Sequence, residues 1–126
     1  MMRQSSTQTG AKGIVSGQVS NGATWIESFE LSQNDLEIDG ADTSTWKFVF
    51  KNCDGGNPVL TLTSGEEITV TQNTTSTIFA ILCPQSSISS LCGDYQADFA
   101  QQDADGNIIH WLNGVVTFNE ENLGFS

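Results

Sequence analysis

Short stretches in which apolar and polar residues alternate recur along this chain, and the clearest spans residues 91–118. Between 95 and 99 the alternation has the period of two that a strand with one buried face requires. Residues 103–107 supply turn chemistry, and Gly106 can adopt the positive φ of a tight hairpin. The return stretch is rich in β-branched and aromatic residues and contains Gly114, which indicates a bulge or bend. We therefore expect a long hairpin with a kinked second strand.

Further strands are predicted ahead of this hairpin. Residues 45–51 place three aromatic side chains on one face and two lysines on the other, which favours a strand. Residues 76–83 are apolar throughout, as in a central strand that is covered on both sides. Pro84 ends that run, and the connector after it has room for one helical turn at 86–91. The other predicted strands are 24–31, 59–63 and 68–71, with a short strand or edge piece at 36–38.

The spacing of these elements predicts the fold class. About seven or eight short strands, separated by turn residues and without a helix-length amphipathic segment, indicate an all-β fold, an antiparallel immunoglobulin-like β-sandwich. The antibody arrangement of Cys, Trp and Cys is absent, so only the architecture is implied. At 126 residues the chain fits one domain. We expect the sandwich at 24–119, an N-terminal arm at 1–23 and a C-terminal tail at 120–126.

The N-terminal stretch, residues 1–23, is small, polar and glycine-rich and shows neither a helical nor a strand period. One interpretation is a flexible tail. The other is an extended arm that orders on a neighbouring subunit, with residues 13–19 adding as a strand to an exposed sheet edge. In the second interpretation Ile14, Val15 and Val19 are the interface candidates.

The charge balance excludes one class of partner. Fifteen acidic residues against four basic ones give a net charge of −11. Because neutralising phosphates needs clustered Lys and Arg, we expect no nucleic-acid binding. The acidity fits solubility, repulsion of wrong partners or docking on a basic surface. The chain has no apolar run of about 18 residues and begins without an apolar signal segment, so we expect neither a membrane span nor secretion.

The three cysteines, Cys53, Cys83 and Cys92, leave at least one thiol unpaired. This argues against a disulfide scaffold and suits folding in a reducing cytoplasm, although a Cys83–Cys92 bridge stays an alternative. His110 is the only histidine, so no Cys/His cluster supports a zinc site. Residues 103–107 resemble a calcium loop but lack its terminal Glu, so a hairpin turn is favoured. We expect no metal and no cofactor.

No catalytic constellation is recognisable in the sequence. His110 stands in a predicted strand, where a packed or half-exposed histidine is favoured over a general base. The serines lack a G-x-S-x-G elbow, and no acid can be placed to orient a Ser–His pair. Most carboxylates fall in turns, where solvation explains them. We therefore expect that the protein is not an enzyme.

The tryptophans are the candidates for glycan binding, which would need exposed aromatic side chains. Trp25, Trp46 and Trp111 all fall in predicted strands, where a core position is favoured. Trp111 is the best surface candidate, because the alternation around it does not decide which residues face inward. It is therefore a further interface candidate, and a carbohydrate-binding module that assists host-surface adsorption is the alternative function.

Three motifs within residues 29–118 are specific. They are Gly93-Asp94-Tyr95 at the start of a strand, the turn Asp103-Ala104-Asp105-Gly106, and the bent final strand His110-Trp111-Leu112-Asn113-Gly114-Val115-Val116-Thr117-Phe118. With them the chain resembles small virion proteins of tailed bacteriophages, and in layout it is similar to the N-terminal domain of phage baseplate upper proteins. A departure is the long stretch ahead of the first strand, and no receptor-binding or catalytic residues carry over.

The resemblance implies a non-enzymatic structural protein of a phage particle, present in several symmetric copies. It would be an adaptor or accessory subunit of the tail, baseplate or neck, or a head decoration. Its partners would be other virion proteins and copies of itself, engaged by sheet edges and the N-terminal arm. It would assemble in the host cytoplasm and reside in the virion.

Overall fold

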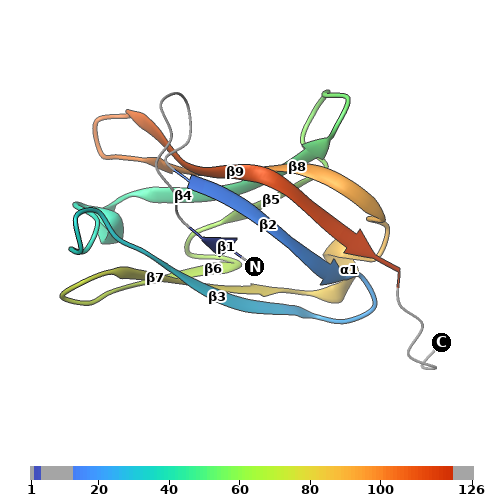
Figure 1. Ribbon diagram of the computed structural model, residues 1–126, viewed down its shortest axis with the longest axis horizontal. Coiled ribbons are helices and arrows are strands. Elements are labelled where there is room, and N and C mark those ends of the chain that lie inside the picture. Colours follow the sequence, from blue (N-terminus) through green and yellow to red (C-terminus); the bar gives the residue numbers. More distant parts are fainter. Residues whose placement is uncertain (1, 4–12, 121–126) are drawn as a thin grey trace.

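The structure, a computed structural model, describes residues 2–3 and 13–120 and is all-β, with two sheets arranged as in a β-sandwich (Figure 1). The two sheets form the upper and lower layers of Figure 1. The elements are β1 (Met2–Arg3), β2 (Gly13–Ser20), β3 (Trp25–Leu31), the 3-10 turn η1 (Ala41–Thr43), β4 (Thr45–Asn52), β5 (Leu60–Thr63), β6 (Ile68–Gln72), β7 (Thr77–Cys83), α1 (Gln85–Ile88), β8 (Gly93–Gln102) and β9 (Ile108–Asn119).

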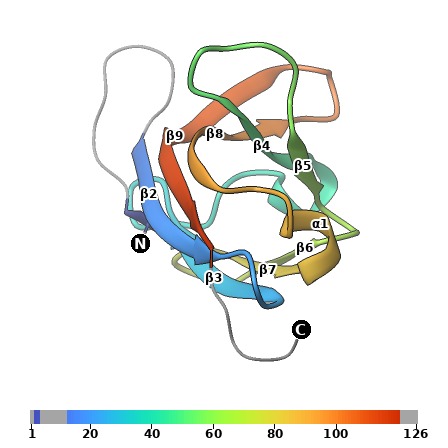
Figure 2. The same ribbon diagram turned by 90° about the vertical axis from the view of Figure 1, so that its right-hand side faces the viewer.

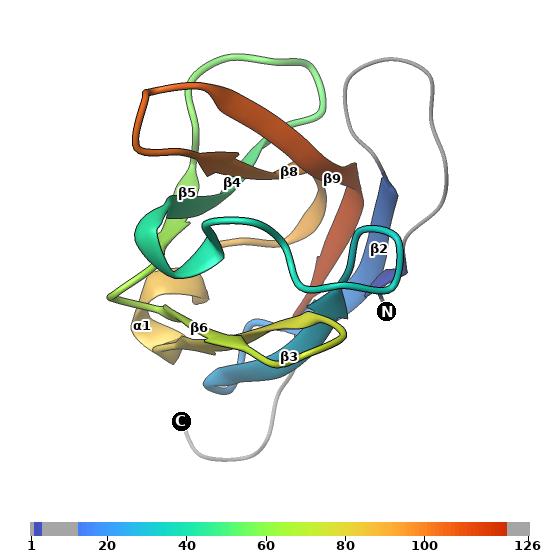
Figure 3. The same cartoon turned by 90° about the vertical axis from the view of Figure 1, so that its left-hand side faces the viewer.

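The larger sheet has six strands in the order β1-β2-β9-β8-β4-β5, and the smaller has three in the order β3-β7-β6. Figure 3 shows β3 and β6 in the layer below β4, β5 and β8. The expectation of purely antiparallel sheets is wrong at one pairing, because β2 runs parallel to β9. The larger sheet is therefore mixed. No helix in the described part of the chain is both long and apolar enough to cross a membrane.

Two predicted elements differ from those observed. Residues 36–38 are not a strand: Gln33 and Leu36 exchange backbone hydrogen bonds of 3.0 and 3.1 Å around a tight turn. Asn34 and Asp35 both take positive φ there, 55° and 61°, which asparagine and aspartate tolerate better than most residues. The single helical turn after Pro84 begins one residue earlier than expected and ends at Ile88, which is buried.

The core between the sheets is largely aromatic. Trp46 of β4 contacts Phe79 of β7 across the two sheets, with ring centroids 4.5 Å apart. Phe99 of β8 stacks on Trp46 at 5.2 Å and meets Phe79 edge to face at 4.9 Å. Each such pair contributes about 0.5–1.5 kcal/mol beyond the burial of its apolar area. The other buried aromatic residues are Trp25, Phe29, Phe48, Phe50, Tyr95, Trp111 and Phe118.

The predicted kink in β9 is present, but it lies at Trp111 and not at Gly114. Phe99 pairs with Leu112 while the next residue, Ala100, pairs with His110, so Trp111 is the extra residue of a β-bulge. Trp111 and Leu112 are consequently both buried, at 2% and 0% exposure. The bulge thus breaks the strict alternation from which a strand's inward face is predicted.

Residues 13–20, which the sequence interpretation assigned to an arm, form β2 within the sandwich. β2 pairs with β9 from Gly13↔Leu112 to Ser20↔Asn119, and the two strands lie side by side in Figure 2. The predicted strand at 13–19 does pair with another strand, but this partner, β9, belongs to the same chain and not to a neighbouring subunit. The larger sheet therefore takes in residues ahead of 24, both β2 and, at its edge, β1. The rest of the predicted arm (1 and 4–12) and the tail from 121 onward lie outside the described residues.

Candidate functional site

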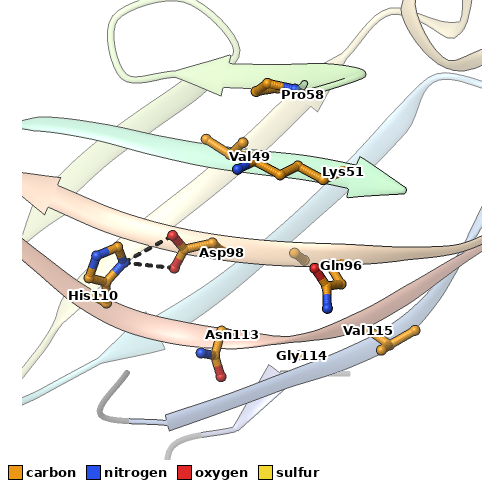
Figure 4. A pocket seen from close by; sticks show the side chains of 10 residues that line it. Val49, Lys51, Pro58, Gln96, Asp98, His110, Asn113, Gly114 and Val115 are labelled. Carbon is orange, nitrogen blue, oxygen red and sulfur yellow. Dashed lines mark hydrogen bonds and ion pairs between the residues drawn. The ribbon is translucent and has the colours of Figure 1, made fainter. Parts of the chain in front are cut away.

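An open hollow of about 760 Å³ lies on the outer face of the six-stranded sheet. Figure 4 shows its side chains, which come from β4, β8 and β9, with Pro58 from the loop before β5. Carboxylate, imidazole, amide and ammonium groups line it together with two valines. The lining residues are Val49, Lys51, Pro58, Gln96, Ala97, Asp98, His110, Asn113, Gly114 and Val115.

Strand alternation positions this face. In β4 the aromatic residues point into the core, which turns Lys47, Val49 and Lys51 outward. The register then aligns Val49 with Asp98 of β8 and Asp98 with Asn113 of β9. Side chains from three strands are thereby brought into one row.

His110 and Asp98 form the salt bridge of this face when the histidine is protonated. The Nδ1 atom of His110 lies 2.9 Å from Oδ2 and 3.0 Å from Oδ1 of Asp98. The two side chains are 46% and 40% exposed, so the pair contributes at most about 1 kcal/mol to stability. The half-exposed strand histidine was predicted, but its partner was not, because the bulge at Trp111 decides which β8 residue His110 meets.

Lysines and aspartates occupy neighbouring strands of the same face. Lys47 and Lys51, the two lysines of the described chain, stand on β4, and Asp94 and Asp98 stand on β8. Asp94 accepts a hydrogen bond of 2.6 Å from Thr117 Oγ1. Within the described residues the salt bridges comprise the His110–Asp98 pair alone, so neither lysine is held by a carboxylate at ion-pair distance.

The sequence-derived interface candidates do not gather at this hollow. Trp111 is buried and its Nε1 donates to Gln101 Oε1 at 3.0 Å, so it takes the favoured core position and is not the surface aromatic for which it was the best candidate. Trp25 and Trp46 are buried too, which leaves the described surface without a tryptophan platform for a glycan. Val19 is only 5% exposed. Ile14 and Val15 lie in β2, where their backbones pair with Asn113 and Gly114.

The 103–107 segment forms the predicted hairpin turn. Asp103 Oδ1 accepts hydrogen bonds from the backbone N–H groups of Asp105 and Asn107 at 3.0 and 2.9 Å, and its Oδ2 accepts one from Asn107 Nδ2 at 3.2 Å. The bonds from Asn107 lower the pKa of Asp103 below its ordinary value. No group of three or more metal-ligating side chains is found among the residues that the structure describes.

All three cysteines are free thiols in the structure, so the alternative Cys83–Cys92 bridge is not formed. Cys53 and Cys92 are exposed, whereas Cys83 is buried. Burial raises the pKa of the Cys83 thiol, and the nearby Glu67 carboxylate raises it further. A raised pKa keeps the thiol protonated and therefore a poor nucleophile.

No protein-family model matches the chain, and no curated protein matches it.

Proposed function

We propose that this chain is a non-enzymatic structural protein of a bacteriophage virion. It serves as an adaptor or accessory subunit of the tail, baseplate or neck, or as a head decoration, and acts by burying interfaces with neighbouring subunits. The observation that carries the proposal is the β8–β9 hairpin. The three motifs behind the resemblance to phage virion proteins form the start of β8, the turn and the bulged β9, and this hairpin supplies most of the outer hollow.

The strand order supports assigning an immunoglobulin-like topology to the sandwich. The order β3-β7-β6 corresponds to B-E-D of an immunoglobulin domain and β9-β8-β4 to G-F-C, with β5 in the place of C′. Tyr95 resembles the tyrosine corner of such domains. It stands near the start of β8, accepts a hydrogen bond from the Cys92 N–H at 3.1 Å and donates to the Cys92 carbonyl at 3.3 Å. The disulfide of antibody domains has no counterpart, since Ala97 occupies the second cysteine's position.

The proposal is tested by purifying particles of the phage that encodes the chain and identifying their proteins by mass spectrometry. We expect the chain in the particles at a fixed ratio to the other virion proteins. A deletion phage, propagated with the protein supplied from a plasmid, is the control and should regain it. Particles that never contain the chain would refute the proposal.

A further inference from the structure

We propose that the outer face of the six-stranded sheet is the site at which two copies of this chain pair, face to face, about a two-fold axis. The inference rests on the proposed assembly role and names the partner for this face, a second copy. It starts from where the few positive charges of the molecule lie. In a chain of net charge −11, both described lysines stand on this face, on the exposed side of β4.

The rest of the described surface carries carboxylates without lysines. Two copies that approach through an acidic part of that surface therefore bring like charges together, which costs free energy. On the six-stranded face, Lys47 and Lys51 balance Asp94 and Asp98. A second copy that approaches this face therefore meets lysines and aspartates in equal number.

The charges also lie in an order that is complementary to itself. The register places Asp98 beside Val49, midway between Lys47 and Lys51. Consider a two-fold axis that is parallel to the strands and lies between the two facing sheets, above the gap between β4 and β8. Such an axis places β4 of each copy over β8 of the other. Each copy's two lysines then flank the partner copy's aspartate at that level. Such reciprocal contact, in which the same patch serves both subunits, is what a two-fold interface requires.

The middle of the face can be desolvated at small cost. Val115 is 44% exposed and Val49 is half-buried, and both line the hollow. His110 already satisfies Asp98, so this carboxylate is not left without a partner when water is excluded.

Sedimentation velocity over a range of concentrations tests the pairing. We expect the wild-type chain to dimerise and Lys51→Glu to raise the dissociation constant at least about tenfold, because two glutamates then face aspartates. The matched control is Thr69→Glu/Thr71→Glu, which makes the same change in net charge at exposed positions of β6 and should dimerise as the wild type does. Circular dichroism checks that each variant folds.

Mixing two charge-reversed chains gives the sharper result. Lys47→Glu/Lys51→Glu and Asp94→Lys/Asp98→Lys should each be monomeric alone and form a one-to-one heterodimer together. A wild-type chain that stays monomeric at its highest soluble concentration overturns the inference, and so do reversed chains that dimerise unchanged. If the chain is monomeric but present in particles, the dimer is refuted and the virion role is not. Another virion protein would then cover this face. A dimer that is absent from particles refutes only the role.

Discussion

Asp103 fixes the β8–β9 turn through hydrogen bonds that its ionised carboxylate accepts from Asp105 and Asn107. Since these bonds lower its folded-state pKa below the ordinary value of 3.8, the stabilisation is present above that value and is lost as the pH falls through the folded pKa. Asp103→Asn should therefore lower Tm at neutral pH, and the difference from wild type should shrink in acid. Thermal unfolding from neutral pH to about pH 2 measures it; a difference that does not change with pH would contradict the assignment.

Tyr95 links the start of β8 to the segment after α1. Its hydroxyl exchanges two hydrogen bonds with the backbone of Cys92, while its ring packs on Phe118 with centroids 5.5 Å apart. Tyr95→Phe keeps the ring contact and removes the hydroxyl, so we expect a loss of about 0.5–1.5 kcal/mol in the free energy of unfolding. Urea unfolding checks this. Equal stability of the two proteins would show that water replaces the hydroxyl without cost.

Residue-scale predictions from sequence succeeded where the interaction is local. The 103–107 turn was predicted because aspartate, glycine and asparagine act on their own backbone within a few positions. The contact between His110 and Asp98 was not predicted, because it depends on how two strands are aligned. The alternation around Trp111 left its side undecided for the same reason: one extra residue in β9 changes which side chains face the core.

At the scale of elements, the bulge in β9 is held by a buried polar side chain. Gln101 is 2% exposed; its Oε1 accepts from Trp111 Nε1 at 3.0 Å and its Nε2 donates to Ser44 Oγ at 2.8 Å. Gln101→Leu removes these hydrogen bonds and a third, longer one from Nε2 to the Asp39 carbonyl at 3.4 Å, and we expect it to cost about 1–3 kcal/mol in the free energy of unfolding. The exposed neighbour provides the control, since Gln102→Leu should change stability little. Equal effects of the two changes would show that the bulge does not depend on Gln101.

β2 is predicted to be part of the cooperative fold and not a detachable arm. Val19 is buried and pairs with Phe118, so Val19→Asp places a charge in the interior and should cost about 3–5 kcal/mol. Gln18→Asp introduces the same charge at the adjacent exposed position and should cost far less. Chemical denaturation compares them. If Val19→Asp leaves the unfolding midpoint unchanged, β2 separates from the sheet without unfolding it.

The strands that sequence alone predicted have a strong period-two pattern or a continuous apolar run, as in β4, β7 and β8. The expectation that the apolar run of β7 is covered on both sides was wrong, because its outer face is open and Leu82 is 60% exposed. β2 was not predicted to join the sandwich, because its residues are small and polar and its partner, β9, lies at the far end of the chain. A parallel pair formed by strands at opposite ends of the chain leaves no turn or hairpin motif in the sequence by which it could be predicted. The prediction for residues 36–38 was wrong in the opposite sense. Two apolar residues suggested a short strand or edge piece there, whereas backbone hydrogen bonds between Gln33 and Leu36 close a turn.

At the scale of the whole molecule, two sheets enclose an aromatic core. The two outer faces differ in charge: both described lysines are on the six-stranded face, where Lys51 and Asp98 line the hollow. Sequence alone supplied the net charge of −11. The positions of the lysines relative to β8 and β9 required the sheet order.

Lysine footprinting of intact particles tests most directly whether this face meets another subunit in the virion. Purified particles and the dilute free protein are labelled with the same amine reagent and digested, and the modification of Lys47 and Lys51 is measured by mass spectrometry. If the six-stranded face is an assembly interface, both lysines react several-fold less in particles than in the free chain. Particles that contain the chain but label both lysines as fully as the free protein would contradict the account.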